Sequence, residues 1–356
     1  MEEEKKKKYK EWFKRFWKYV IKTTNGMAQG LFATLIIGTI LSTVGRLIPQ
    51  EFFALTGGEK PLYLYDAFQN IATTLKGLMG VGIGIGVGLS LSLTPIQCLS
   101  AGIAGAIGTT ICPGNPLMAY VCSIAGIEIT RRLVLRKKTP VDMILIPLLV
   151  SLFSFIIGWL LKYPVDWMIN GLASVIDTAT EAQPFIMGIV ISVLMGMALT
   201  APISSVAIAT AISLSGIAGG AAVVGCSVQM VGFAVMTAME KGNGIGKTIS
   251  VGIGTSMLQF KNILKNPLIW IPTILVSAIL GPIATCWLHM ETSVAGAGMG
   301  TSGLVGQIGT IDAMGWTTES ILGISLLHIL LPILLVFGLT LLFKKLKWIH
   351  QGDLLL

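Results

Sequence analysis

The sequence has little charge. Asp, Glu, Lys and Arg make up only 12% of its 356 residues, whereas a soluble protein of this size carries about 25%. Hydrophobic residues make up 53%, and the mean hydropathy is +0.81. An ordinary soluble globular domain is thereby excluded. The composition predicts a polytopic membrane protein, in which lipid replaces water around most side chains.

The sequence also lacks the common signatures of enzymes and metal sites. It contains no Walker-type phosphate loop, no HExxH sequence and no nucleophile elbow. Its five cysteines include no CxxC pair and lie in or beside apolar segments, so we interpret them as packing residues. They are Cys98, Cys112, Cys122, Cys226 and Cys286. We therefore expect no catalytic residue, no bound metal and no cofactor.

Apolar stretches long enough to cross a bilayer recur along the chain. A helix needs about 20 apolar residues to span the hydrocarbon core. We predict an all-α fold with about ten transmembrane helices, at 26–48, 67–93, 96–112, 116–130, 141–162, 184–200, 203–222, 223–239, 268–288 and 321–343. The transmembrane domain would extend over 25–343. A basic amphipathic helix over 1–24 would lie on the cytoplasmic membrane surface, and 344–356 would form a cytoplasmic tail.

Basic residues gather on one side of this layout. With a cytoplasmic N-terminus, 21 of the 25 Lys and Arg residues fall in inner segments, which predicts that both termini are cytoplasmic. The four exceptions are Arg46, Lys60, Lys76 and Lys162. Nine of the seventeen acids fall in the outer loops, at 49–66, 163–183 and 289–320. Because the basic residues occupy separate loops rather than one groove, they do not indicate nucleic acid as a partner.

Two halves of the chain resemble each other. MGVGIGIGVGLSLSLTPI at 79–96 and MGIVISVLMGMALTAPI at 187–203 share Met-Gly, a second Gly and a closing Pro-Ile. We predict a tandem repeat of four helices, with halves at about 67–162 and 184–288, and a helix break at matching prolines. Such breaks point to a transport site. The alternative is chance matching of small residues, because membrane chains share a narrow alphabet.

Polar side chains at membrane depth are costly and are therefore candidates for a solute site. Lys76 and Glu181 could form an ion pair facing an outer vestibule, although Lys76 could instead extend to the interface. Amides at helix breaks could bind a neutral polar solute, although each could instead tie helices together. The predicted solute-binding residues are Asn115, Glu181, Gln183, Gln229, Gln259, His289, Glu291, Thr301, Ser302 and Gln307.

The stretch AGAGMGTSGLVGQIG at 295–309 contains six glycines in fifteen residues. Irregular backbone at membrane depth is tolerated only where it is buried in protein or lines a watery cavity. We predict a loop that re-enters from the outer side and forms part of the solute site. A mobile outer loop is the alternative. The apolar segment 248–260 is too short to cross, so it is also expected to be re-entrant or interfacial.

Long stretches of the chain resemble the phosphotransferase-system EIIC-like membrane family, in the branch that includes the perfringolysin O regulator. These are NGMAQGLFATLIIGTIL at 25–41, PISSVAIATAISLSGIAGGAAVVGCSVQMVGFAVM at 202–236, NPLIWIPTILVSAILGPIAT at 266–285 and AGAGMGTSGLVGQ at 295–307. The resemblance extends from about residue 24 to 343. It implies a dimeric permease in a bacterial inner membrane that takes up a sugar-like solute, with phosphoryl transfer by a separate EIIB-type protein.

The sequence departs from well-known sugar permeases of this family in one informative place. It lacks their Gly-Ile-Thr-Glu motif, and GIEIT at 126–130 lies at an inner helix end. We therefore keep two hypotheses. The first is a permease for a small polar solute that works by alternating access, and the second is a membrane-embedded sensor or regulator that binds a ligand without transporting it. Small solute, membrane lipid and a second copy of the chain are expected partners.

Overall fold

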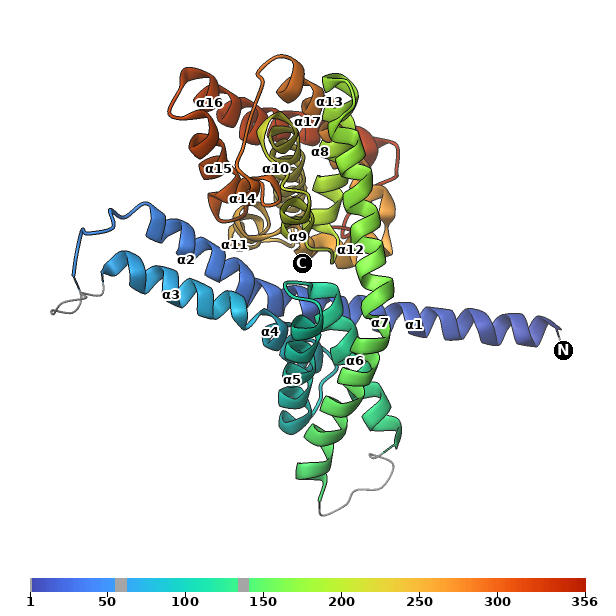
Figure 1. Cartoon of the computed structure of the whole chain (residues 1–356). Coiled ribbons are helices and arrows are strands. Elements are labelled where there is room, and N and C mark those ends of the chain that lie inside the picture. Colours follow the sequence, from blue (N-terminus) through green and yellow to red (C-terminus); the bar gives the residue numbers. More distant parts are fainter. Residues whose placement is uncertain (1, 55–62, 134–140) are drawn as a thin grey trace.

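The computed structural model describes residues 2–54, 63–133 and 141–356, and this part of the chain is helical (Figure 1). It contains two isolated β-bridges and no β-strand in those ranges. The predicted all-α class is confirmed. Two groups of helices pack beside each other, one from the first half of the chain and one from the second, and the long helix α7 runs along both (Figure 1).

The chain begins with one long helical run. Helix α1 (Glu2–Leu31) continues through a π-helical turn at Phe32–Ile36 into α2 (Ile37–Arg46) without a break at residue 24. The predicted surface helix over 1–24 is therefore the first part of the same helix that forms the first span. Helix α3 (Leu64–Gly77) packs back along α2. It meets α4 (Met79–Ser90) at a 50° bend.

Small residues bring the helices of the first group close together. Helix α4 packs against α1 and against α5 (Pro95–Ile111), which in turn packs against α6 (Pro116–Leu133). A Cβ atom placed on Gly84 would lie 1.9 Å from the carbonyl oxygen of Ala101, so these backbones touch. Close approach through small residues is a usual way to pack transmembrane helices.

Helix α7 (Asp142–Thr180) is much longer than the predicted span over 141–162. Its 39 residues extend about 58 Å at 1.5 Å per residue. The predicted outer loop over 163–183 is wrong, because the helix continues to Thr180 in spite of Pro164. Val165 packs into one hydrophobic cluster of the first group and Ile176 into a cluster of the second. This burial on both groups outweighs the disruption that an internal proline causes.

The second group is built around one buried helix. Helix α8 (Pro184–Thr200) and α13 (Ile271–Cys286) both pack against α10 (Gly216–Ala238), and the seven-residue α9 (Ser205–Ala211) precedes α10. The division into spans at 203–222 and 223–239 is wrong, because α10 runs unbroken through that boundary. The small residues at its start permit close approach, as at Gly220, where a Cβ would meet the Met290 carbonyl.

The remaining elements of the second group are mostly short. They are α11 (Ile245–Ile249), a π-helical turn at Ser250–Gly254, 3₁₀ turns at Ser256–Gln259, Pro267–Trp270 and Ser302–Leu304, α12 (Phe260–Lys265), α14 (Val294–Ala297), α15 (Val305–Met314), α16 (Thr318–Gly323), a π-helical segment at Ile324–Leu330 and α17 (Leu331–Lys345). The segments 248–260 and 295–309, both predicted to be re-entrant, thus fold as short, broken helical turns rather than as crossing helices.

The described residues form five helical runs that are long and apolar enough to cross a membrane, and a sixth if the bent pair α3–α4 is one span. The count of ten is therefore not confirmed, although a helical membrane protein with several spans is. Two of the missing spans correspond to α5 and α8, which are apolar but have only 17 residues each. The tandem repeat stays a prediction.

Candidate functional site

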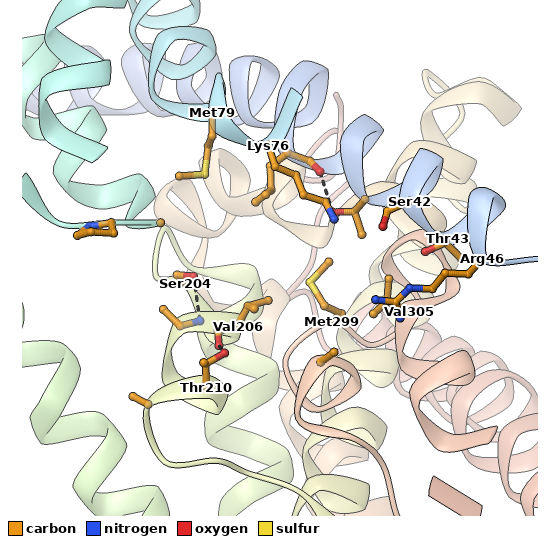
Figure 2. A pocket seen from close by; sticks show the side chains of 17 residues that line it. Ser42, Thr43, Arg46, Lys76, Met79, Ser204, Val206, Thr210, Met299 and Val305 are labelled. Carbon is orange, nitrogen blue, oxygen red and sulfur yellow. Dashed lines mark hydrogen bonds between the residues drawn. The ribbon is translucent and has the colours of Figure 1, made fainter. Parts of the chain in front are cut away.

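A cavity of about 710 Å³ lies where the two groups of helices meet. We call it the central cavity. Helices α2 and α3 cover one side, the loop after α5 and helix α9 form another, and the glycine-rich segment 295–309 forms the third (Figure 2). Pockets that bury small ligands commonly have volumes of about 300–1,000 Å³.

The first wall presents three hydroxyls and one cation from a single face of α2. Thr39, Ser42, Thr43 and Arg46 follow one another at helical spacing, so they share one side of α2. The Ser42 hydroxyl donates to Oε1 of Gln69 on α3 (2.8 Å), and Nε2 of Gln69 donates back to the Ser42 carbonyl (2.9 Å). This reciprocal pair fixes α2 against α3.

The second wall comes from the loop after α5 and from one side of α9. Pro113 and Gly114 lie in the loop between α5 and α6, and Gly114 has a φ of +68°. At α9, the Ser204 hydroxyl accepts the Ala207 N–H (3.2 Å), and the Thr210 hydroxyl donates to the Val206 carbonyl (2.8 Å) (Figure 2). Both hydroxyls line the central cavity while they stabilise their own helix.

The third wall is the glycine-rich segment, which contributes Ala295, Met299 and Val305 to the cavity. Residues 296–303 are buried, as the buried-loop interpretation expects and a mobile outer loop does not. Gly300 has a φ of +53°, and a Cβ there would lie 2.6 Å from the backbone carbon of Cys226 in α10. The backbone can therefore pass this close to α10 only with glycine at position 300.

The segments 248–260 and 295–309 contact each other through two side chains predicted to bind solute. The Thr301 hydroxyl donates to the Gly252 carbonyl, and the Ser302 hydroxyl donates to the Gly254 carbonyl at 2.8 Å. Both side chains are buried and neither lines the central cavity. They hold the third wall in place rather than facing the cavity.

The charge around the central cavity is of one sign. Arg46 and Lys76 line it, and no Asp or Glu of the described ranges does. Figure 2 shows both side chains extending from α2 and α3 over the cavity, with Met299 facing them. Among the described residues, neither cation takes part in a salt bridge. Arg46 is exposed at the end of α2, and Lys76 is half-buried. The arrangement can bind a polar solute through hydroxyls and attract negative charge.

The two buried amides Asn115 and Gln229 make bonds within the helix bundle. Oδ1 of Asn115 accepts the backbone N–H groups of Leu117 and Met118, which caps α6. Oε1 of Gln229 accepts Nε1 of Trp270 (3.0 Å) and the Thr273 hydroxyl (2.9 Å). Neither lines the central cavity. Each amide retains one NH₂ group without a partner.

Gln259 lies in a cluster that holds the segment 350–356, and we call this cluster the tail clamp. Nε2 of Gln259 donates to the Leu354 carbonyl (3.0 Å) and the Thr237 hydroxyl (2.7 Å), and its Oε1 accepts Nδ2 of Asn262 (2.6 Å). The other side chains of the clamp bond the same segment, and they are Glu240, Asn243, Asn262 and Asn266. The predicted amide therefore holds the tail.

Gln307 pairs with the buried His328, with Nε2 of the amide 3.1 Å from Nδ1 of the ring. Oε1 of Gln307 and Nε2 of His328 have no partner. His289 is exposed, with a φ of 40°, and Glu291 is half-buried beside Met314. None of these three predicted residues lines the central cavity.

Glu181 and Gln183 lie at the exposed junction between α7 and α8, at the C-terminal boundary of α7 and the N-terminal boundary of α8. Lys76 and Glu181 form no ion pair. Lys76 is the one predicted residue that lines the central cavity, and it does so without Glu181.

Sequence reasoning missed most of the polar lining. The missed residues are Arg46 and the hydroxyls of Thr39, Ser42, Thr43, Ser204 and Thr210. One signal was present in the sequence, because Arg46 and Lys76 are two of the four cations that fall outside the basic inner segments. A cation that departs from that rule indicates a local role for its charge. Among the described residues, no cluster of His, Cys, Asp and Glu is placed to hold a metal ion.

Comparison with known proteins finds one family whose model matches all the residues that line the cavity. The family model described as "Phosphotransferase system, EIIC" matches residues 21–356. No curated protein and no solved structure matches the chain. The matched range includes all three walls of the central cavity and the tail clamp.

Proposed function

The chain belongs to the EIIC family of the phosphotransferase system, and from this premise we propose that it is a permease for a small sugar-like solute that binds in the central cavity. Membership makes it a membrane component of sugar transport. The observation that supports the cavity as the binding site is its position between the two groups of helices, with polar walls from both. Solute sites of transporters commonly lie between two such bodies.

Alternating access would move one group of helices against the other. Helices α2 and α3 belong to the first group, and α9 and the segment 295–309 belong to the second. Opening the cavity to either side requires these walls to separate on one face and close on the other. Helix α7 packs on both groups and would serve as the connecting element.

The proposal includes three partners and an orientation. A separate EIIB-type protein would phosphorylate the solute at the cytoplasmic face, and a second copy of the chain would complete a homodimer within the lipid of a bacterial inner membrane. With both termini cytoplasmic, Arg46 would lie toward the outer face and Lys76 deeper in the cavity. The solute would then enter past Arg46.

The test is uptake by the purified protein in proteoliposomes. Radiolabelled glucose and glucuronate would be supplied to wild type, to Ala207→Trp, which fills the cavity, and to Ala313→Trp as a control on an exposed face of α15. We expect saturable uptake of at least one solute by wild type and Ala313→Trp, and none by Ala207→Trp. Binding without uptake would contradict a permease and support the ligand sensor.

A further inference from the structure

Among the described residues, the lining of the central cavity carries two positive charges and no negative one. Arg46 at the end of α2 and Lys76 on α3 both line it, and their side chains extend over the same volume (Figure 2). Like charges in a partly desolvated site repel each other, and the repulsion grows as water is excluded. The lining supplies no carboxylate, and neither cation has a salt-bridge partner in the described ranges. A ligand with negative charge would supply the missing counter-charge.

The rest of the lining suits a polyol. Hydroxyls of Ser42, Thr43 and Ser204 can exchange hydrogen bonds with hydroxyl groups of a ligand, and Met79 and Met299 supply apolar contact for its carbon face. A guanidinium can bind a carboxylate or phosphate through two parallel hydrogen bonds, and an ammonium adds a point charge. The walls therefore combine recognition of hydroxyls with recognition of an anion.

We infer that the solute of this protein is an anionic polyol, namely a sugar acid or a sugar phosphate, whose carboxylate or phosphate group lies between Arg46 and Lys76. This inference rests on the proposed function, because it names the substrate class of the same cavity. It goes beyond that function, since a neutral sugar would also satisfy a permease. The hydroxyl-bearing part of the solute would face α9 and the third wall.

A second pocket provides the matched control. It is lined by Lys247 and Lys261 near the tail clamp, and Lys261 is half-buried like Lys76. Its charge could also attract an anion, so the two lysines make a direct pair of variants. Lys76→Gln and Lys261→Gln remove the same charge from two different pockets. Lys76→Arg keeps the charge and tests whether charge itself is required.

The experiment is calorimetric titration of the purified full chain with pairs of ligands that differ in charge. Glucuronate is compared with glucose, and glucose 6-phosphate with inorganic phosphate, at low and high NaCl. We expect glucuronate or glucose 6-phosphate to bind at least about tenfold more tightly than glucose, with the preference falling as salt rises. Lys76→Gln should weaken the preferred ligand about 10- to 100-fold, whereas Lys76→Arg and Lys261→Gln should retain its binding.

Each outcome decides the inference. Preference for glucuronate identifies a sugar acid, and preference for glucose 6-phosphate over both glucose and inorganic phosphate identifies a sugar phosphate. Equal or tighter binding of glucose would overturn the anionic class of solute. If Ala207→Trp abolishes that glucose binding, the proposal of a permease with its site in the central cavity still stands. Binding that survives Ala207→Trp would remove the cavity from both proposals. Loss of anion binding in Lys261→Gln but not in Lys76→Gln would also overturn the inference, as would no binding of any anionic probe.

Discussion

The central cavity and the tail clamp are both rich in polar side chains, yet they use them in opposite ways. In the tail clamp, the amides of Gln259 and Asn262 donate to the backbone carbonyls of Leu354 and Leu355, so these side chains bind another segment of the same chain. In the central cavity, Arg46 and Lys76 face open volume without an acidic partner among the lining residues. The amides of the tail clamp are thus bonded to the protein itself, whereas the two cations of the central cavity remain available to a ligand.

The difference shows that polarity at membrane depth does not by itself identify a solute site. A buried amide in a membrane protein finds a partner within the fold whenever one is available, because an unpaired polar group is costly there. A charge that remains unpaired beside a cavity is the rarer observation. The comparison therefore predicts separate effects, in which variants of the clamp change stability and variants of the cavity change binding.

The largest expected effect is on a residue that positions a cavity wall. Gly300→Ala places a Cβ against the backbone of Cys226 at a φ of +53°, so we expect a loss of about 3 kcal/mol or more in the free energy of unfolding. Thermal unfolding in detergent measures it. The control is Gly114→Ala, which has a φ of +68° but open space around it and should lose only about 1 kcal/mol. Equal losses would show that close approach to α10 is unimportant.

Gln259→Leu should be the next most severe change. It leaves the Leu354 carbonyl, the Thr237 hydroxyl and the Asn262 amide each with one bond fewer, and we expect a loss of about 2–3 kcal/mol in stability. Solute affinity should be unchanged in the protein that remains folded. Asn266→Ala, at a half-buried position of the same clamp, serves as the milder control. If folded Gln259→Leu binds solute more weakly than wild type, Gln259 contributes to the solute site and its assignment to the tail clamp alone is wrong.

Gln307→Leu separates the sequence-based site from the central cavity with a smaller effect. The substitution removes the bond to His328 but also removes an Oε1 that has no partner. The net loss of stability should be about 1 kcal/mol. Titration of glucuronate should give the wild-type dissociation constant. A tenfold change in that constant would place Gln307 in contact with solute.

The smallest expected effect concerns the pH dependence of stability at Lys261. Burial, followed by repulsion from Lys265 and Lys247, lowers the pKa of Lys261 below its usual 10.5. The unfolded chain therefore holds this proton more strongly, so stability should rise with pH as pH increases toward 10.5. Melting temperatures of wild type and Lys261→Gln at several alkaline pH values test this. A rise of the same size in both proteins would show that Lys261 does not contribute.

Much of the fold follows from local signals in the sequence. Prolines at the starts of α5 and α8 occupy the first helical turn. Backbone N–H groups in that turn have no acceptor within the helix, so a proline, which has no N–H, removes no hydrogen bond there. The burial of the glycine-rich segment 295–309 also follows from its composition. The length of α7 does not, because contacts of Val165 and Ile176 with residues far away in sequence hold the helix beyond Pro164.

The candidate site was harder to predict than the fold for a related reason. Whether an amide such as Gln259 is free depends on the segment that reaches it, and the tail comes from about 95 residues farther along the chain. The hydroxyls of α2 lie on the same helix face as Arg46 at regular spacing. A helix that packs against a neighbour through small polar residues would have the same spacing, so the pattern alone does not indicate a cavity. What distinguishes the cavity is that Arg46 and Lys76 have no salt-bridge partner among the described residues, and this is a property of three-dimensional packing.

The most direct test measures melting temperature with and without saturating glucuronate for wild type, Lys76→Gln and Gln259→Leu in parallel. The account predicts that Lys76→Gln melts near wild type but loses the stabilisation by glucuronate, whereas Gln259→Leu melts lower and keeps it. The reverse pattern, with the ligand shift lost in Gln259→Leu and retained in Lys76→Gln, would contradict the assignment of the central cavity as the solute site.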